Sequence, residues 1–84
     1  MLDANIVIAR CIEQVYESAA PHHPVRIGTI AGRVLPKSDG SQIVKIQVNI
    51  LYPGANGRPG EERFAPIDCV IENTGHLTIK AHQP

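Results

Sequence analysis

The strict alternation of side chains in residues 42–52 is the strongest constraint on the fold. From Val44 to Tyr52 every even-numbered position is apolar or aromatic, whereas the odd-numbered positions include Lys45 and Gln47. Successive side chains of a β-strand point to opposite faces of its sheet, so this pattern predicts a strand with one buried face. The chain must therefore supply a second layer that covers that face.

Residues 3–20 carry the periodicity of an amphipathic helix. Their apolar positions recur every three or four residues, as they do on one face of a helix. Asp3 is placed to cap the first turn, and Pro21, which has no N–H group, is placed to end the helix. The predicted buried face consists of Ile8, Ile12, Val15 and Ala19, widened by Leu2, Ile6 and Tyr16.

Residues 25–35, 63–72 and 76–81 are the other predicted strands. Each contains alternating apolar side chains and is bounded by turn-forming residues. Residues 53–62 contain two Pro and three Gly and no core-forming side chain, so they predict a flexible loop. The element order over residues 1–84 is therefore α-β-β-β-β.

This order predicts an α+β fold in one domain, with the N-terminal helix packed on a four-stranded antiparallel sheet of two hairpins. The length of 84 residues and the apolar content of 43 % fit a single small core. The alternative is a small, strongly bent β-barrel with an N-terminal helix, because Gly28 and Gly32 supply possible corners in the first strand.

The dipeptide Asp39-Gly40 predicts a tight turn between the first two strands. With these two residues as the loop, Leu35 lies opposite Val44, and Arg33 must either reach out at an edge of the sheet or find a partner. The outer face of this hairpin then carries Ile30, Val34, Ile43 and Leu51 among Arg26, Lys45, Gln47 and Asn49. A face of mixed apolar and polar character fits a partner interface, unless the second hairpin folds over it to close a barrel.

Two cysteines do not by themselves indicate a disulfide framework. Cys11 falls on the predicted helix and Cys69 in an apolar strand, so we expect both to be free thiols in the core. This predicts a reduced, cytoplasmic location. The first eleven residues have no basic leader, and their apolar run is too short to span a bilayer, so no membrane partner is expected.

No motif in the chain marks an enzyme active site. The sequence contains no G-x-S-x-G element, and its glycine-rich loop has neither a G-K-[ST] ending nor a following helix. The four histidines are scattered and are not expected to converge on a metal ion. We therefore expect no catalytic residue, no cofactor and no metal site; the histidines are His22, His23, His76 and His82.

Charge leaves nucleic-acid binding as an alternative function. Eight basic residues balance eight acidic ones over the whole chain, but residues 24–60 hold five basic residues and one acidic residue. This basic middle would suit a small-barrel module that binds DNA or RNA, although the exposed set lacks aromatic side chains for base stacking. A small enzyme with a site formed between subunits is the third possibility.

The sequence favours a small, non-catalytic protein–protein interaction module. It would act as an accessory subunit, a homodimeric adaptor or a stoichiometric inhibitor of a larger complex, with another protein or a second copy of itself as partner. The expected binding surface is the outer face of the first hairpin. Its predicted residues are Arg26, Ile30, Arg33, Val34, Lys45, Gln47 and Asn49.

Overall fold

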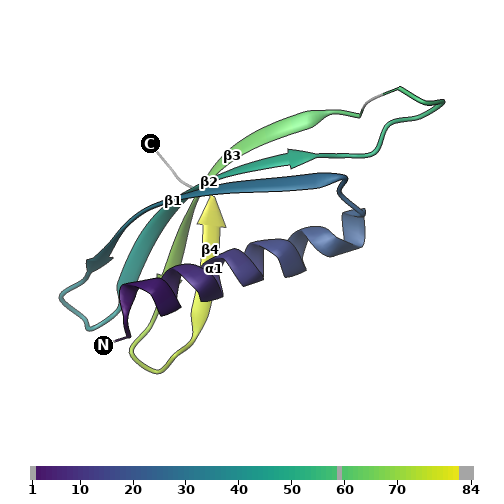
Figure 1. The fold of residues 1–84 in the computed structure, drawn as a ribbon. Coiled ribbons are helices and arrows are strands. Elements are labelled where there is room, and N and C mark those ends of the chain that lie inside the picture. Colours follow the sequence, from purple (N-terminus) through teal and green to yellow (C-terminus); the bar gives the residue numbers. More distant parts are fainter. Residues whose placement is uncertain (1, 59, 82–84) are drawn as a thin grey trace.

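A computed structural model describes residues 2–58 and 60–81. Helix α1 (Ala4–Ala19) is extended by a 3-10 turn, η1 (Ala20–His22), and four strands follow: β1 (Arg26–Pro36), β2 (Gln42–Leu51), β3 (Glu62–Ile71) and β4 (Leu77–Ala81). The strands form one antiparallel sheet in the order β1-β2-β3-β4, and α1 lies across one of its faces (Figure 1). The predicted α+β fold is confirmed, whereas the barrel alternative is wrong because the sheet is open, with β1 and β4 at its edges.

Helix α1 begins and ends at local signals that the sequence contains. The carboxylate of Asp3 accepts a 2.8 Å hydrogen bond from the backbone N–H of Asn5, so it caps the first turn. Pro21 lies in η1, and His23 then adopts a left-handed conformation with φ of 50°. This reversal sends the chain back along the sheet as β1 (Figure 1).

The helix buries only part of the predicted stripe: Val15 and Ala19 are buried, as predicted. Ile8 and Ile12 are only half-buried, and Ile6 and Tyr16 are exposed. The first three turns are apolar on several sides, so periodicity alone does not fix the rotation of the helix about its axis. The face that packs on the sheet consists of Val7, Cys11, Val15 and Ala19.

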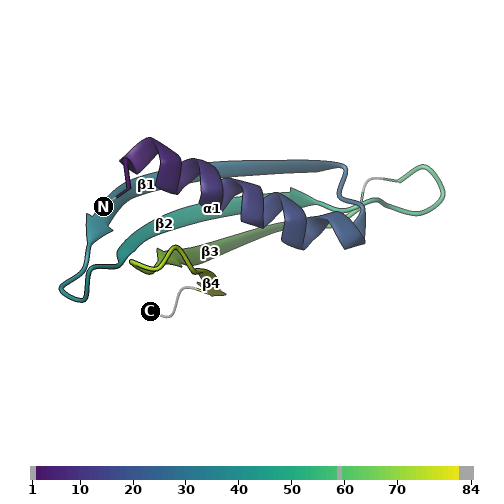
Figure 2. The same ribbon diagram turned by 90° about the horizontal axis from the view of Figure 1, so that it is seen from below.

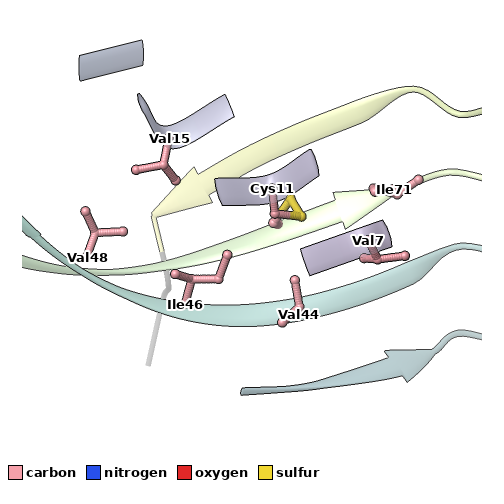
Figure 3. Packing of buried hydrophobic residues seen from close by; sticks show 8 residues of the cluster. Val7, Cys11, Val15, Val44, Ile46, Val48 and Ile71 are labelled. Carbon is pink, nitrogen blue, oxygen red and sulfur yellow. A yellow bond between two sulfur atoms is a disulfide. The ribbon is translucent and has the colours of Figure 1, made fainter. Parts of the chain in front are cut away.

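Strand β2 is the centre of the core, as its alternation predicts. Val44, Ile46 and Val48 are buried and point toward α1 (Figure 3). Cys69 and Ile71 of β3 complete the buried cluster from the neighbouring strand. The helix therefore covers the inner face of the sheet (Figure 2), and no described element covers the outer face (Figure 1).

A disulfide joins α1 to β3 through the middle of this core. Cys11 and Cys69 are bonded and completely buried, with their Cα atoms 6.1 Å apart (Figure 3). The expectation of two free thiols is therefore wrong. The cysteines are 58 positions apart, so the sequence does not reveal their proximity, and packing of the helix across β2 and β3 brings them together.

The predicted register of the first hairpin is also wrong. Lys37 and Ser41 pair through a 2.8 Å backbone hydrogen bond, which makes the loop three residues long, with Gly40 at φ of 89°. A bulge between Ala31 and Val34 shifts the pairing once more. Val34 consequently lies opposite buried Val44 on the inner face, and Leu35 lies opposite Ile43 on the outer face.

The side chain of Gln42 fastens the start of the chain to β2. Its amide oxygen accepts a hydrogen bond from the backbone N–H of Leu2, and its amide nitrogen donates to the carbonyl of Leu2, both at 3.2 Å. The amide thus mimics a neighbouring strand, which explains why a polar side chain is buried here. Together with the disulfide, this contact fixes both the position and the rotation of α1.

The disulfide predicts a large dependence of stability on reductant. Closing a loop of 58 residues lowers the entropy of the unfolded chain, which in the loop-entropy model is worth about 4 kcal/mol. The Cys11→Ala/Cys69→Ala variant, and the wild type in dithiothreitol, should each lose most of this free energy of unfolding in urea titrations. Alkylation of both cysteines in denatured, unreduced protein, seen by mass spectrometry, would show that the bond is absent.

Candidate interaction surface

The uncovered side of the sheet, here called the outer face, is defined by the strand register. Residues paired across the strands share a face, and the pairing of Ile30 with Gln47 and of Gln47 with Pro66 fixes which set points away from α1. From β1 to β4 the outer face consists of Arg26, Gly28, Ile30, Leu35, Ile43, Lys45, Gln47, Asn49, Leu51, Glu62, Phe64, Pro66, Asp68, Val70, Thr78 and Lys80.

Three large apolar side chains stand out from this face into solvent. Ile30 is 74 % exposed, Phe64 is 71 % exposed and Leu35 is 47 % exposed. They come from two different strands and lie on the same side of one sheet. Single exposed hydrophobic residues are ordinary, but several on one uncovered face are typical of an interaction surface.

The charged side chains of the outer face alternate in sign across the strands. Lys45 of β2 lies opposite Asp68 of β3, which in turn lies opposite Lys80 of β4. Near the other end, Arg26 approaches Glu62, with 3.7 Å between Nη2 and Oε1. Such exposed pairs add little stability, but they give the face a fixed pattern of charge that a partner must match.

A hollow of about 240 Å³ lies beside Gly28, on the β1 side of the outer face. Asn49 lies between Gly28, which has no side chain, and Phe64, whose ring projects from the sheet. The surface is therefore depressed on the Gly28 side of the Phe64 ring. The amide oxygen of Asn49 is buried here without a hydrogen-bond partner among the described residues. The residues that line this hollow also include Ile30 and Gln47.

The structure brings most of the predicted interface residues together and removes one. Arg26, Ile30, Lys45, Gln47 and Asn49 share the outer face. Arg33 is exposed in the bulge at the β1 edge, which corresponds to the first of the two predicted alternatives. Val34 is not part of the surface because the three-residue loop and the bulge turn it toward the core, as described above.

Sequence reasoning missed half of this surface, because it considered only the first hairpin. Strand β3 contributes Phe64, Pro66 and Val70 to the outer face, directly beside β2. The signal was present: the alternation of Ala65 and Ile67 as inward residues implies that Phe64 points outward.

A second apolar hollow lies on the opposite side of the sheet, beside the last turns of α1. It has a volume of about 240 Å³ and is lined mainly by inward apolar residues such as Val15, Val48 and Ile67. His22 and Tyr52 also line this hollow, and their rings pack edge to face with 6.3 Å between the ring centroids. This hollow marks the part of the inner face that the helix does not cover.

The scattered histidines do not form a metal site within residues 2–58 and 60–81. No group of three or more His, Cys, Asp or Glu side chains in these ranges is arranged to hold a metal ion. His82 lies outside the described residues. Among the helices that are described, none is long and apolar enough to cross a membrane.

Comparison with known proteins gives no relative. No protein-family model, no curated protein and no solved structure matches this chain. Any functional proposal must therefore rest on the surface itself.

The β1–β2 turn predicts one measurable pKa shift. The hydroxyl and the backbone N–H of Ser41 both donate to Asp39, the latter at 2.9 Å, and these bonds hold the pKa of the Asp39 carboxyl below its ordinary value. Because the folded pKa is depressed, the resulting stability is present above the unfolded pKa and is lost as the pH falls through the folded one.

An NMR titration of the Asp39 carboxyl should therefore show a midpoint below that of an unfolded peptide. In the Ser41→Ala variant the hydroxyl bond cannot form, whereas the backbone N–H of residue 41 can still donate to Asp39, so the midpoint should rise part of the way toward the peptide value. Identical titration curves for the wild type and the variant would contradict the assignment of the shift to Ser41.

Proposed function

We propose that this chain is a small, non-catalytic protein–protein interaction module that binds through its outer face. The observation that carries the proposal is the exposure of Ile30, Leu35 and Phe64 on one uncovered face of the sheet. Burial of these side chains by a partner supplies the main favourable free energy of association. The alternating charges around them supply selectivity.

Nucleic-acid binding has less support from the same surface. Arg26 is paired with Glu62, and Lys45 lies opposite the acidic residue Asp68. A nucleic-acid site needs a continuous basic stripe that follows the phosphates, and alternation in sign interrupts such a stripe. A site formed between subunits, as in an oligomeric enzyme, stays a prediction without a specific observation in its favour.

The cytoplasmic location predicted from the sequence loses its original argument. It rested on free cysteines, whereas Cys11 and Cys69 are bonded. Structural disulfides form and persist mainly in oxidising compartments. The Cys11–Cys69 disulfide therefore favours a subunit or adaptor that works in an oxidising compartment.

Substitutions on the outer face test the proposal against a matched control. Ile30→Asp and Phe64→Asp each place a charge in the apolar part of the surface and should weaken association at least about thirtyfold, the effect of removing an interface hot spot. Ile6→Asp makes the same chemical change on the exposed side of α1, where Ile6 is 47 % exposed, and should have no such effect.

The measurement is retention of partner proteins, including added untagged copies of the chain, on each immobilised variant. Circular dichroism and thermal melting verify that all three variants fold. Equal retention by Ile30→Asp, Phe64→Asp and Ile6→Asp would show that the outer face is not the binding surface.

A further inference from the structure

We infer that the partner of the outer face is a second copy of this chain. The two copies pack face to face about a twofold axis that runs parallel to the strands, between β2 and β3. The result is a four-layer homodimer with the sheets inside and the helices outside. This inference rests on the proposed function, because it names the partner of the same surface.

The strand register makes the outer face complementary to itself about this axis. Each β2 residue of the outer face lies beside a paired residue of β3, and the rotation exchanges these two strands. A residue of β2 therefore faces the partner copy's version of its own neighbour. Lys45 faces the partner's Asp68, and Ile43 faces the partner's Val70, so opposite charges meet and apolar side chains meet.

The same rotation places an aromatic side chain over the hollow beside Gly28. Asn49 is paired with Phe64, so each Phe64 comes to lie over Asn49 of the other copy, next to the 240 Å³ hollow. Phe64 is 71 % exposed in one copy, and the hollow is bordered by Ile30 and by the bare backbone of Gly28. A protruding ring and a hollow on one surface are what an isologous contact requires.

The size of the face fits a weak but specific dimer. Strands β1, β2 and β3 are 10 or 11 residues long. With a rise of about 3.4 Å per residue and a strand spacing of about 4.8 Å, the face is roughly 34 Å by 14 Å. Two copies together bury about 1,000 Å² in projection, the lower end of specific interfaces, so association should depend on concentration.

At the rim the rotation brings Lys80 toward the partner's Arg33, because both lie in the row that contains Lys45. Arg33 and Lys80 are exposed, so water and salt screen this pair of like charges. The dimer should therefore survive moderate salt.

The first experiment measures mass by sedimentation equilibrium from about 1 µM to about 1 mM, the range of weak dissociation constants. We expect the mass to rise from 9.1 kDa toward twice that value for the wild type. Gly28→Val fills the hollow and should stay monomeric while folding normally, since a Cβ at Gly28 meets only the Cβ of Asn49 at 3.8 Å. Ile6→Asp should dimerise like the wild type.

The second experiment tests the axis by mixing two charge-reversed variants. Lys45→Glu alone places Glu opposite the partner's Asp68, and Asp68→Lys alone places Lys opposite the partner's Lys45, so each should dimerise at least about tenfold more weakly. In an equimolar mixture, both contacts between unlike copies again join opposite charges. The heterodimer should therefore form within about threefold of the wild-type affinity.

The outcomes separate this inference from the proposed function. A wild type that stays at 9.1 kDa up to about 1 mM overturns the inference that the partner is a second copy. The proposed function would still be supported if a foreign protein bound the wild type and failed to bind Ile30→Asp. A dimer that Gly28→Val leaves intact, or a mixture that does not recover association, overturns the proposed geometry. A dimer that also persists in Ile30→Asp and Phe64→Asp does not use the outer face and overturns this inference. If these two variants also retain the same foreign proteins as Ile6→Asp, the proposed function is overturned as well.

Discussion

Packing of α1 against one face of the sheet is the contact on which the rest of the structure depends. Helix α1 is the one long helix in the described part of the chain. The disulfide between Cys11 and Cys69 and the Gln42–Leu2 hydrogen bonds hold it on the inner face. A single helix covers one side of a four-stranded sheet and leaves the other side bare. The exposure of Ile30 and Phe64 is therefore a direct consequence of the element order, not of a local irregularity.

Most of the fold could be predicted from the sequence, because its strongest signals are local. The alternation in β2, the helix start at Asp3 and the helix end at Pro21 are each determined by a few neighbouring residues. They identify these elements nearly to their ends. The register of β1 could not be predicted in the same way. It depends on the conformation of Gly40 in the loop and on the bulge before Val34, and each shifts the pairing by one residue.

The error in register had a limited effect on the candidate surface because two shifts occurred. Beyond the bulge the even-numbered residues of β1 again lie outside, so Arg26 and Ile30 keep their predicted face. Between the loop and the bulge the faces are exchanged, which moves Val34 inward and Leu35 outward. The disulfide was missed for a related reason, since it follows from how α1 crosses β3 and from nothing near either cysteine.

The edges of the sheet help to explain why association should use a face. An exposed edge strand offers unpaired N–H and C=O groups to any other strand, and proteins protect such edges with bulges, charges, proline and short strands. Strand β1 carries the bulge at Gly32–Arg33 and ends at Pro36, and β4 is only five residues long. Pairing along these edges is thereby disfavoured, whereas the outer face offers rows of side chains whose charges and shapes already match across the strands. In the proposed dimer, the partner copy would be recognised by the same pairs of residues that lie side by side within one sheet.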